Sequence, residues 1–97
     1  MHWVVAEATA TASALHRATG DPSYARWSET WWQHIDTCFR DPEHGSWHHE
    51  LSPENRPSHL TWDGKPDIYH AFQATLLPRL PLAPTLARAL ADGLLET

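Results

Sequence analysis

The chain has 97 residues, enough for one small domain and too few for two. Its net charge is −5 and its arginines are scattered, so it lacks the basic stripe that nucleic-acid binding requires. A single cysteine, Cys38, excludes an internal disulfide and fits a reducing compartment. Because neither a signal peptide nor a long apolar span is visible, we expect a soluble, cytoplasmic protein without a membrane partner.

The first predicted element is an alanine-rich helix over residues 3–18. It is apolar over most of its surface, which is typical of a helix buried among others. Gly20 is the expected C-cap of this helix. Asp21 followed by Pro22 predicts the start of the next helix, with proline at the first helical position.

The second helix is predicted over residues 22–39, and the tight linker before it indicates an antiparallel hairpin. Its apolar stripe recurs every three or four residues, at Tyr24, Trp27, Trp31, Ile35 and Cys38. Such a stripe, widened by Trp32, is more typical of core packing than of a platform for stacking sugars.

The second half of the chain is predicted to be a long connection followed by two further helices. Residues 46–51 alternate weakly and fit a short strand or an extended arm. Residues 52–66 form a long polar loop, a class in which functional loops are common. The last helices are expected over 67–77 and over 83–95, with Pro84 near the start of the fourth.

Six tryptophans are a large number for a chain that offers so little interior. Either some of them line an open pocket, or they cover a surface meant for a partner or for further sequence. We therefore expect an all-α protein with two antiparallel helical hairpins, joined by a long loop or by a loop that contains a short β-hairpin. Residues 1–97 are expected to form a single partial domain.

His70 is the leading candidate for chemistry. Gly64, Lys65 and Pro66 predict a turn, and Asp67 is a good N-cap residue. His70 then falls in the first turn of a helix, where the local field disfavours imidazolium and favours a neutral imidazole able to take a proton. The alternative is a helix-start histidine that only binds a loop carbonyl.

Glu7 is the second candidate, because it lies inside an otherwise apolar helix. Glutamate is almost never fully buried without a partner, so Glu7 is either paired or at a solvated edge. His2 is close enough along the helix to flank the same cavity mouth, unless it belongs to a disordered terminus.

A group of residues suggests a metal site at first sight: His44, His48, His49 and Glu50. On an extended arm, His48 and Glu50 share one face and His49 points away, and no CxxC or HExxH motif accompanies them. We expect ordinary surface or pocket-rim histidines, no metal and no cofactor. The absence of Gly-x-Ser-x-Gly and of a phosphate-binding glycine loop disfavours a hydrolase or a nucleotide binder.

Three segments, 2–8, 45–51 and 64–71, resemble the C-terminal part of the N-acylglucosamine 2-epimerase superfamily and appear in the same order. The Gly-Lys-Pro-Asp-Ile-Tyr-His form is most similar to the aldose–ketose isomerases of that superfamily, the mannose and sulfoquinovose isomerases. The resemblance implies a C-terminal segment of an (α/α)6 barrel, with the first part of the barrel as the partner that completes it.

The resemblance also implies a metal-free conversion of an aldose and a ketose through a cis-enediol, with a monosaccharide as substrate. It matches His70 to an acid/base histidine and Glu7 to an active-site carboxylate. The substrate-binding candidates are His2, Trp3, Trp62, Lys65 and Asp67. A second catalytic histidine belongs to the first half of the family's sequence.

Two alternatives stay open. One is 2-epimerase activity on an N-acylated amino sugar. The other is a four-helix module that binds a partner through its tryptophan-rich face without catalysis. In every case we expect the 97 residues alone to be inactive as an isomerase, and to self-associate if their apolar helix faces remain exposed.

Overall fold

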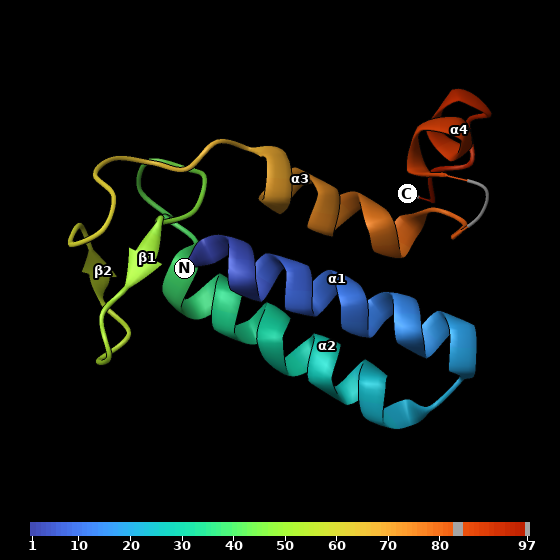
Figure 1. The fold of residues 1–97 in the computed structure, drawn as a ribbon, viewed down its shortest axis with the longest axis horizontal. Coiled ribbons are helices and arrows are strands. Elements are labelled where there is room, and N and C mark those ends of the chain that lie inside the picture. The colour runs from blue at the N-terminus through green and yellow to red at the C-terminus, as the bar shows by residue number, and fades with distance from the viewer. Residues whose placement is uncertain (83–84, 97) are drawn as a thin grey trace.

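The computed structural model of the protein describes residues 1–82 and 85–96, and most of them are helical. Helix α1, His2–Thr19, and helix α2, Pro22–His34, lie side by side as an antiparallel hairpin (Figure 1). The predicted hairpin is therefore confirmed, and α1 differs from its predicted bounds by one residue at each end. None of the helices in the part of the chain that the structure describes is long and apolar enough to span a membrane.

The hairpin turn follows the capping chemistry expected from the sequence. Gly20 has φ 74°, in the left-handed region, and its N–H donates to the carbonyl of His16, which ends α1. The Asp21 carboxylate accepts the backbone N–H of Ser23 at 2.9 Å and begins α2, with Pro22 at the first helical position. These local contacts also hold the pKa of Asp21 below its ordinary value.

The second predicted helix is present in two parts, because α2 continues into a π-helical turn, Ile35–Phe39. This turn supplies the bulky side chains of the main core, Ile35 and Phe39. They pack against small residues of α1 and α3 and against the indole of Trp47. The buried members of this core are Ala6, Ala10, Ile35, Phe39, Trp47 and Ala74.

The prediction that the tryptophan stripe of α2 packs in the core is wrong for Trp27. No residue of α2 is buried among the described residues, and Trp27 is 54% exposed. The rings of Trp27 and Trp31 instead stack on each other, with centroids 5.2 Å apart. The core is filled instead by Ile35 and Phe39 of the turn after α2 and by Trp47, and of the α2 tryptophans Trp32 packs partly against it.

The long connection contains the short β-hairpin that the sequence left possible. Strand β1, Glu50–Leu51, pairs antiparallel with β2, Pro57–Ser58, in the register Glu50 with Ser58. Figure 1 shows this hairpin near the N-terminus of α1, at the end of the molecule away from the α1–α2 turn.

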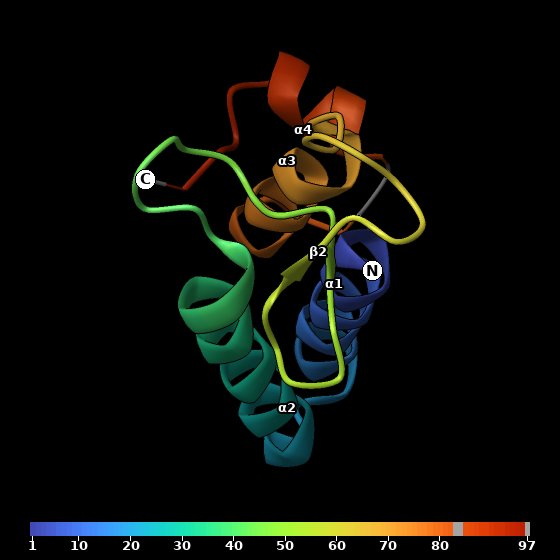
Figure 2. The same ribbon diagram turned by 90° about the vertical axis from the view of Figure 1, so that its left-hand side faces the viewer.

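Helix α3, Tyr69–Leu76, packs along α1 and passes into a 3₁₀ turn, Leu77–Arg79 (Figure 2). Helix α4 is Leu86–Ala91, much shorter than the predicted range 83–95, and Pro84 lies outside the described residues. The chain leaves the helix because Gly93 adopts φ 70°. Helix α4 is attached through a small buried cluster, Leu76, Leu80 and Ala89.

Apolar side chains remain exposed on two separate faces of the molecule. One face follows α1 and α2 and includes Leu15 and Trp27. The other follows α3 and α4 and includes Ile68, Phe72 and Leu90, around a groove of about 760 Å³. Surfaces of this kind are typical of contact with further polypeptide.

Candidate active site

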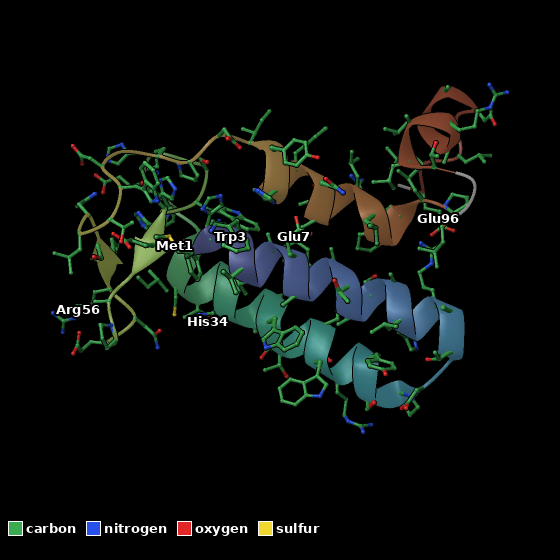
Figure 3. All side chains as sticks on the ribbon, viewed as in Figure 1. Met1, Trp3, Glu7, His34, Arg56 and Glu96 are labelled. Carbon is green, nitrogen blue, oxygen red and sulfur yellow. The ribbon has the colours of Figure 1, made fainter. Side chains whose placement is uncertain are left out.

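Glu7 and His70 meet between α1 and α3. The Nδ1 atom of His70 lies 2.7 Å from Oε1 of Glu7, a hydrogen bond between residues 63 positions apart in the sequence. Figure 3 shows Glu7 and Trp3 on the side of α1 that faces α3, one turn apart. The structure thus brings together the imidazole and the carboxylate that the sequence selected separately.

Small residues make this contact possible. Ala6, Ala10 and Ala74 are buried between the helices, so the two backbones approach closely enough for side chains at the edge to touch. The first turn of α3 is fixed by Asp67, whose Oδ1 accepts the N–H of Tyr69 at 2.9 Å. The N-cap position is Ile68 and not Asp67 as predicted, and α3 begins two residues later than expected, but the Asp67 carboxylate still accepts the first helical N–H.

The pair is only partly shielded from water, with 32% of the His70 side chain and 48% of the Glu7 side chain exposed. Glu7 is thus at a solvated edge and also paired. When Nδ1–H donates to the carboxylate, the tautomer is fixed and Nε2 remains as the basic nitrogen. Trp3 lies beside the imidazole, with ring centroids 6.2 Å apart. The His70 imidazole can therefore accept or donate a proton through Nε2 beside the indole of Trp3.

His2 is buried beneath this pair and is not part of a disordered end. It is 4% exposed, its backbone N–H donates to the carbonyl of His49 at 2.8 Å, and its Nδ1 lies 3.3 Å from the same oxygen. Burial lowers the pKa of His2, the bond to the His49 carbonyl opposes that shift, and the imidazoles of His49 and His70 reinforce it. His2 is therefore expected to be neutral near pH 7.

His49 is a site residue that sequence reasoning missed. Strand alternation was expected to point it away, but its ring packs edge-on against His2 at 4.9 Å and stacks on Trp62 at 6.0 Å. The segment is not paired into a strand until Glu50, so the period of two does not apply to it. The signal that could have found His49 was its place inside the segment 45–51, one of the three segments that resemble the family.

Glu50 holds the loop that carries Trp62. It is buried, and its Oε1 accepts the backbone N–H of Thr61 at 2.7 Å. Hydrogen bonds to Thr61 and Trp62 hold the pKa of the Glu50 carboxyl below its ordinary value, against the effect of burial. The sequence had placed this residue in a candidate metal group, whereas the structure uses it to anchor a loop.

Lys65 binds a loop residue, Asp41, and the neighbouring backbone. Its Nζ donates to Oδ2 of Asp41 at 2.7 Å and to the carbonyl of Gly45 at 2.8 Å. This bond to Lys65 is the main reason why the pKa of Asp41 is held well below its usual range. A substrate-binding role for Lys65 remains a prediction from the resemblance, as do the roles of Trp62 and Asp67.

The histidines of the candidate metal group are not brought together as ligands. In the part of the chain that the structure describes, no three His, Cys, Asp or Glu side chains form a group that could hold a metal ion. His44 is mostly exposed and lies near Glu43, whereas His48 uses its backbone N–H to bind the carbonyl of Phe39.

The fold and the site together define a helical domain with a carboxylate–imidazole pair beside aromatic rings, a class of site suited to proton transfer on a small molecule. A family model described as N-acylglucosamine 2-epimerase (GlcNAc 2-epimerase) matches residues 1–74. The chain belongs to this family, and the resemblance seen in its three motifs is confirmed.

Two curated relatives are similar over nearly the whole chain. A D-mannose isomerase of Thermobifida fusca is 60% identical over 92 residues, which cover 94% of this chain and 23% of the relative. A D-mannose isomerase of Pseudomonas cannabina pv. alisalensis is 55% identical over 91 residues, which cover 94% of this chain and 22% of the relative. The chain therefore spans less than a quarter of the length of these relatives.

Proposed function

We propose that the protein is part of a sugar isomerase that interconverts an aldose and a ketose of the mannose and fructose kind. The single observation that carries the proposal is the 2.7 Å contact between Glu7 and His70. It supplies an oriented imidazole in a chain that is 60% identical to a D-mannose isomerase. In this proposal His70 is the acid/base group and Glu7 is the carboxylate that orients it.

The reaction needs only proton transfers, so atoms and electrons balance without a co-reactant. A base removes the proton from C2 of the ring-opened aldose, the electron pair forms a C1–C2 double bond, and the carbonyl oxygen at C1 takes up a proton. The resulting cis-enediol then receives a proton at C1 and loses one from the oxygen at C2, which gives the ketose. In this proposal Nε2 of His70 serves one of these carbon proton transfers, and the contact of Nδ1 with Glu7 supports the assignment.

The remaining catalytic groups are proposed to come from polypeptide corresponding to the rest of the relatives, more than three quarters of their length. The exposed apolar faces of α1–α2 and α3–α4 are the surfaces on which that polypeptide would pack. The 97 residues alone are accordingly expected to show no isomerase turnover. A second copy of the chain is the competing occupant of the same faces.

Fragment complementation tests this proposal. The Thermobifida fusca D-mannose isomerase is expressed without the segment that matches this chain, purified, and mixed with the 97-residue protein, and the conversion of mannose to fructose is followed. We expect turnover in the mixture and none from either piece. His70→Ala in this chain is expected to abolish the turnover, and retained activity would remove His70 from the mechanism. Robust turnover by the 97 residues alone would contradict the need for a second piece.

The same mixture of the two pieces distinguishes two other functions from the aldose–ketose isomerase. The family description favours 2-epimerisation as an alternative, and product analysis by NMR distinguishes a C2 epimer from a ketose. The exposed stack of Trp27 on Trp31 favours a non-enzymatic binding module. A module of that kind predicts no effect of sugars on the thermal stability of the mixture and no turnover under any condition.

A further inference from the structure

A continuous row of aromatic rings leads from the proposed catalytic imidazole into the loop region. The ring of His70 lies 6.0 Å from that of His2, His2 lies 4.9 Å from His49, and His49 lies 6.0 Å from Trp62. These residues come from α3, α1, the segment before β1, and the loop after β2. The two middle rings therefore connect parts of the chain that are far apart in sequence.

His2 and His49 are also joined through the backbone. The carbonyl of His49 receives the backbone N–H of His2 and lies within reach of its Nδ1. This bond places a proton on Nδ1 of His2 and leaves Nε2 bare. Neither Nε2 of His2 nor Nδ1 of His49 has a hydrogen-bond partner among the described residues, and both atoms are buried.

These two nitrogens without partners determine which charge state of His2 and His49 is compatible with their contact. A neutral imidazole carries one N–H, so each ring can leave its buried nitrogen without a proton. A protonated ring must place an N–H on that nitrogen, where no acceptor is present. The contact between His2 and His49 is consistent with two neutral rings and is opposed by a charge on either one.

We propose that His2 and His49 form a positioning pair that holds His70 and Trp62 in place, and that the pair does so only while both imidazoles are neutral. The importance of this pair for catalysis rests on the proposed function. The positions of the rings do not depend on it. The ring of His2 packs edge-on against the ring of His70, and the ring of His49 stacks on the indole of Trp62. Neither residue is assigned a proton transfer to substrate.

The groups that face His2 come from each element packed against it. His49 faces it from the segment before β1, His70 from α3, and Asp67 from the loop that precedes α3. Two of these three are imidazoles that would repel a charge on His2, and the third is an exposed carboxylate that offers weak compensation. On α1 itself, Glu7 is already bonded to His70. Acidification is thus expected to protonate His2 only below the ordinary imidazole pKa of about 6.5.

The test is an imidazole titration of the ¹⁵N-labelled 97-residue protein by long-range ¹H–¹⁵N NMR, from about pH 8 to about pH 4. This experiment reports the tautomer and charge of each histidine, and the Trp62 indole N–H signal is followed in parallel. His2→Asn places an amide donor where Nδ1 lies and cannot become charged. His44→Asn is the matched control, because the His44 side chain is 72% exposed and lies outside the row of rings.

In the unsubstituted protein we expect His2 to titrate at lower pH than His44. The Nδ1–H signature of His70 and the Trp62 signal should change in the same step as His2. His2→Asn should keep both signals unchanged through that step, whereas His44→Asn should behave as the unsubstituted protein. The proposal is overturned if His2 titrates together with His44, or if His2→Asn loses the His70 signature at the same pH as before.

If His2→Asn does not fold, the unsubstituted protein still decides the question, because the His70 and Trp62 signals either change in the His2 step or do not. Because no turnover is measured, the outcome is independent of the isomerase proposal. Failure of the complementation assay would leave these ring positions standing, and failure of the titration would leave the Glu7–His70 contact standing.

Discussion

Replacing Glu7 with glutamine measures how much the carboxylate contributes to the imidazole it holds. The contact is short, 2.7 Å, but the Glu7 and His70 side chains are 48% and 32% exposed. Unit charges at about 4 Å interact with about 1 kcal/mol in water and about 4 kcal/mol at a dielectric constant near 20. The exposure of this pair places it toward the lower end, about 1–2 kcal/mol.

A loss of that size in the transition state corresponds to a fall in kcat of about 5- to 30-fold. We expect this fall for Glu7→Gln in the complemented isomerase, with KM nearly unchanged, because the carboxylate stabilises imidazolium only as it forms. Glu29→Gln, on the exposed surface of α2, is the matched control and should leave both constants unchanged.

Two results would refute this reasoning. A rise in KM with unchanged kcat would mean that Glu7 binds the sugar and that its bond to His70 is incidental. A fall in kcat of several thousand-fold would mean that Glu7 itself carries a proton, since orientation at a half-exposed site cannot supply that much. Steady-state kinetics on the complemented mixture, at equal occupancy of the two pieces, separates these outcomes.

Three further predictions concern the stability of the 97-residue protein. Leu80→Ala, at a position only 1% exposed, should lower the free energy of unfolding by about 2–5 kcal/mol, whereas Leu60→Ala, at 93% exposure, should change it by less than about 0.5 kcal/mol in urea titrations. Lys65→Met should reduce the loss of stability on acidification. Because the fold depresses the pKa of Asp41, the ionised Asp41 contributes fully to the free energy of unfolding above about pH 4, and this contribution is lost as the pH falls below that. Thermal melts at a series of pH values should show a smaller fall of Tm with falling pH for the variant. Gly20→Ala should cost about 1–2 kcal/mol, because φ is +74° there, and an unchanged Tm would contradict the assigned C-cap.

The elements that the sequence predicted well are those determined by local chemistry. Gly20 and Asp21 each act through bonds to neighbours within four residues, so the hairpin turn needs no information from the rest of the fold. Asp67 likewise binds the N–H of Tyr69 two residues on, although the N-cap position itself is Ile68. The contact between Glu7 and His70 is different, because the sequence selected the two residues separately and their contact depends on how α1 meets α3.

The errors arise where tertiary packing overrides the local pattern. A stripe containing Trp27 has the spacing of a core face, but the spacing does not reveal that Ile35, Phe39 and Trp47 fill the core and leave Trp27 exposed. His49 has the alternation of a strand residue, but pairing begins only at Glu50. The range 83–95 has helical spacing, but Gly93 turns the chain before it can continue.

The exposure of the Glu7–His70 pair connects the site to the unpartnered faces. Water around a half-exposed carboxylate and imidazole screens the attraction between them. The same attraction becomes considerably stronger when water is excluded. The described residues cover these two side chains only in part, and they belong to α1 and the start of α3. The apolar residues that remain exposed run along both of these helices. If the polypeptide that packs on these faces also excludes water from the pair, the interaction energy rises toward about 4 kcal/mol, and the fall in kcat for Glu7→Gln rises from about 5- to 30-fold toward about 1000-fold.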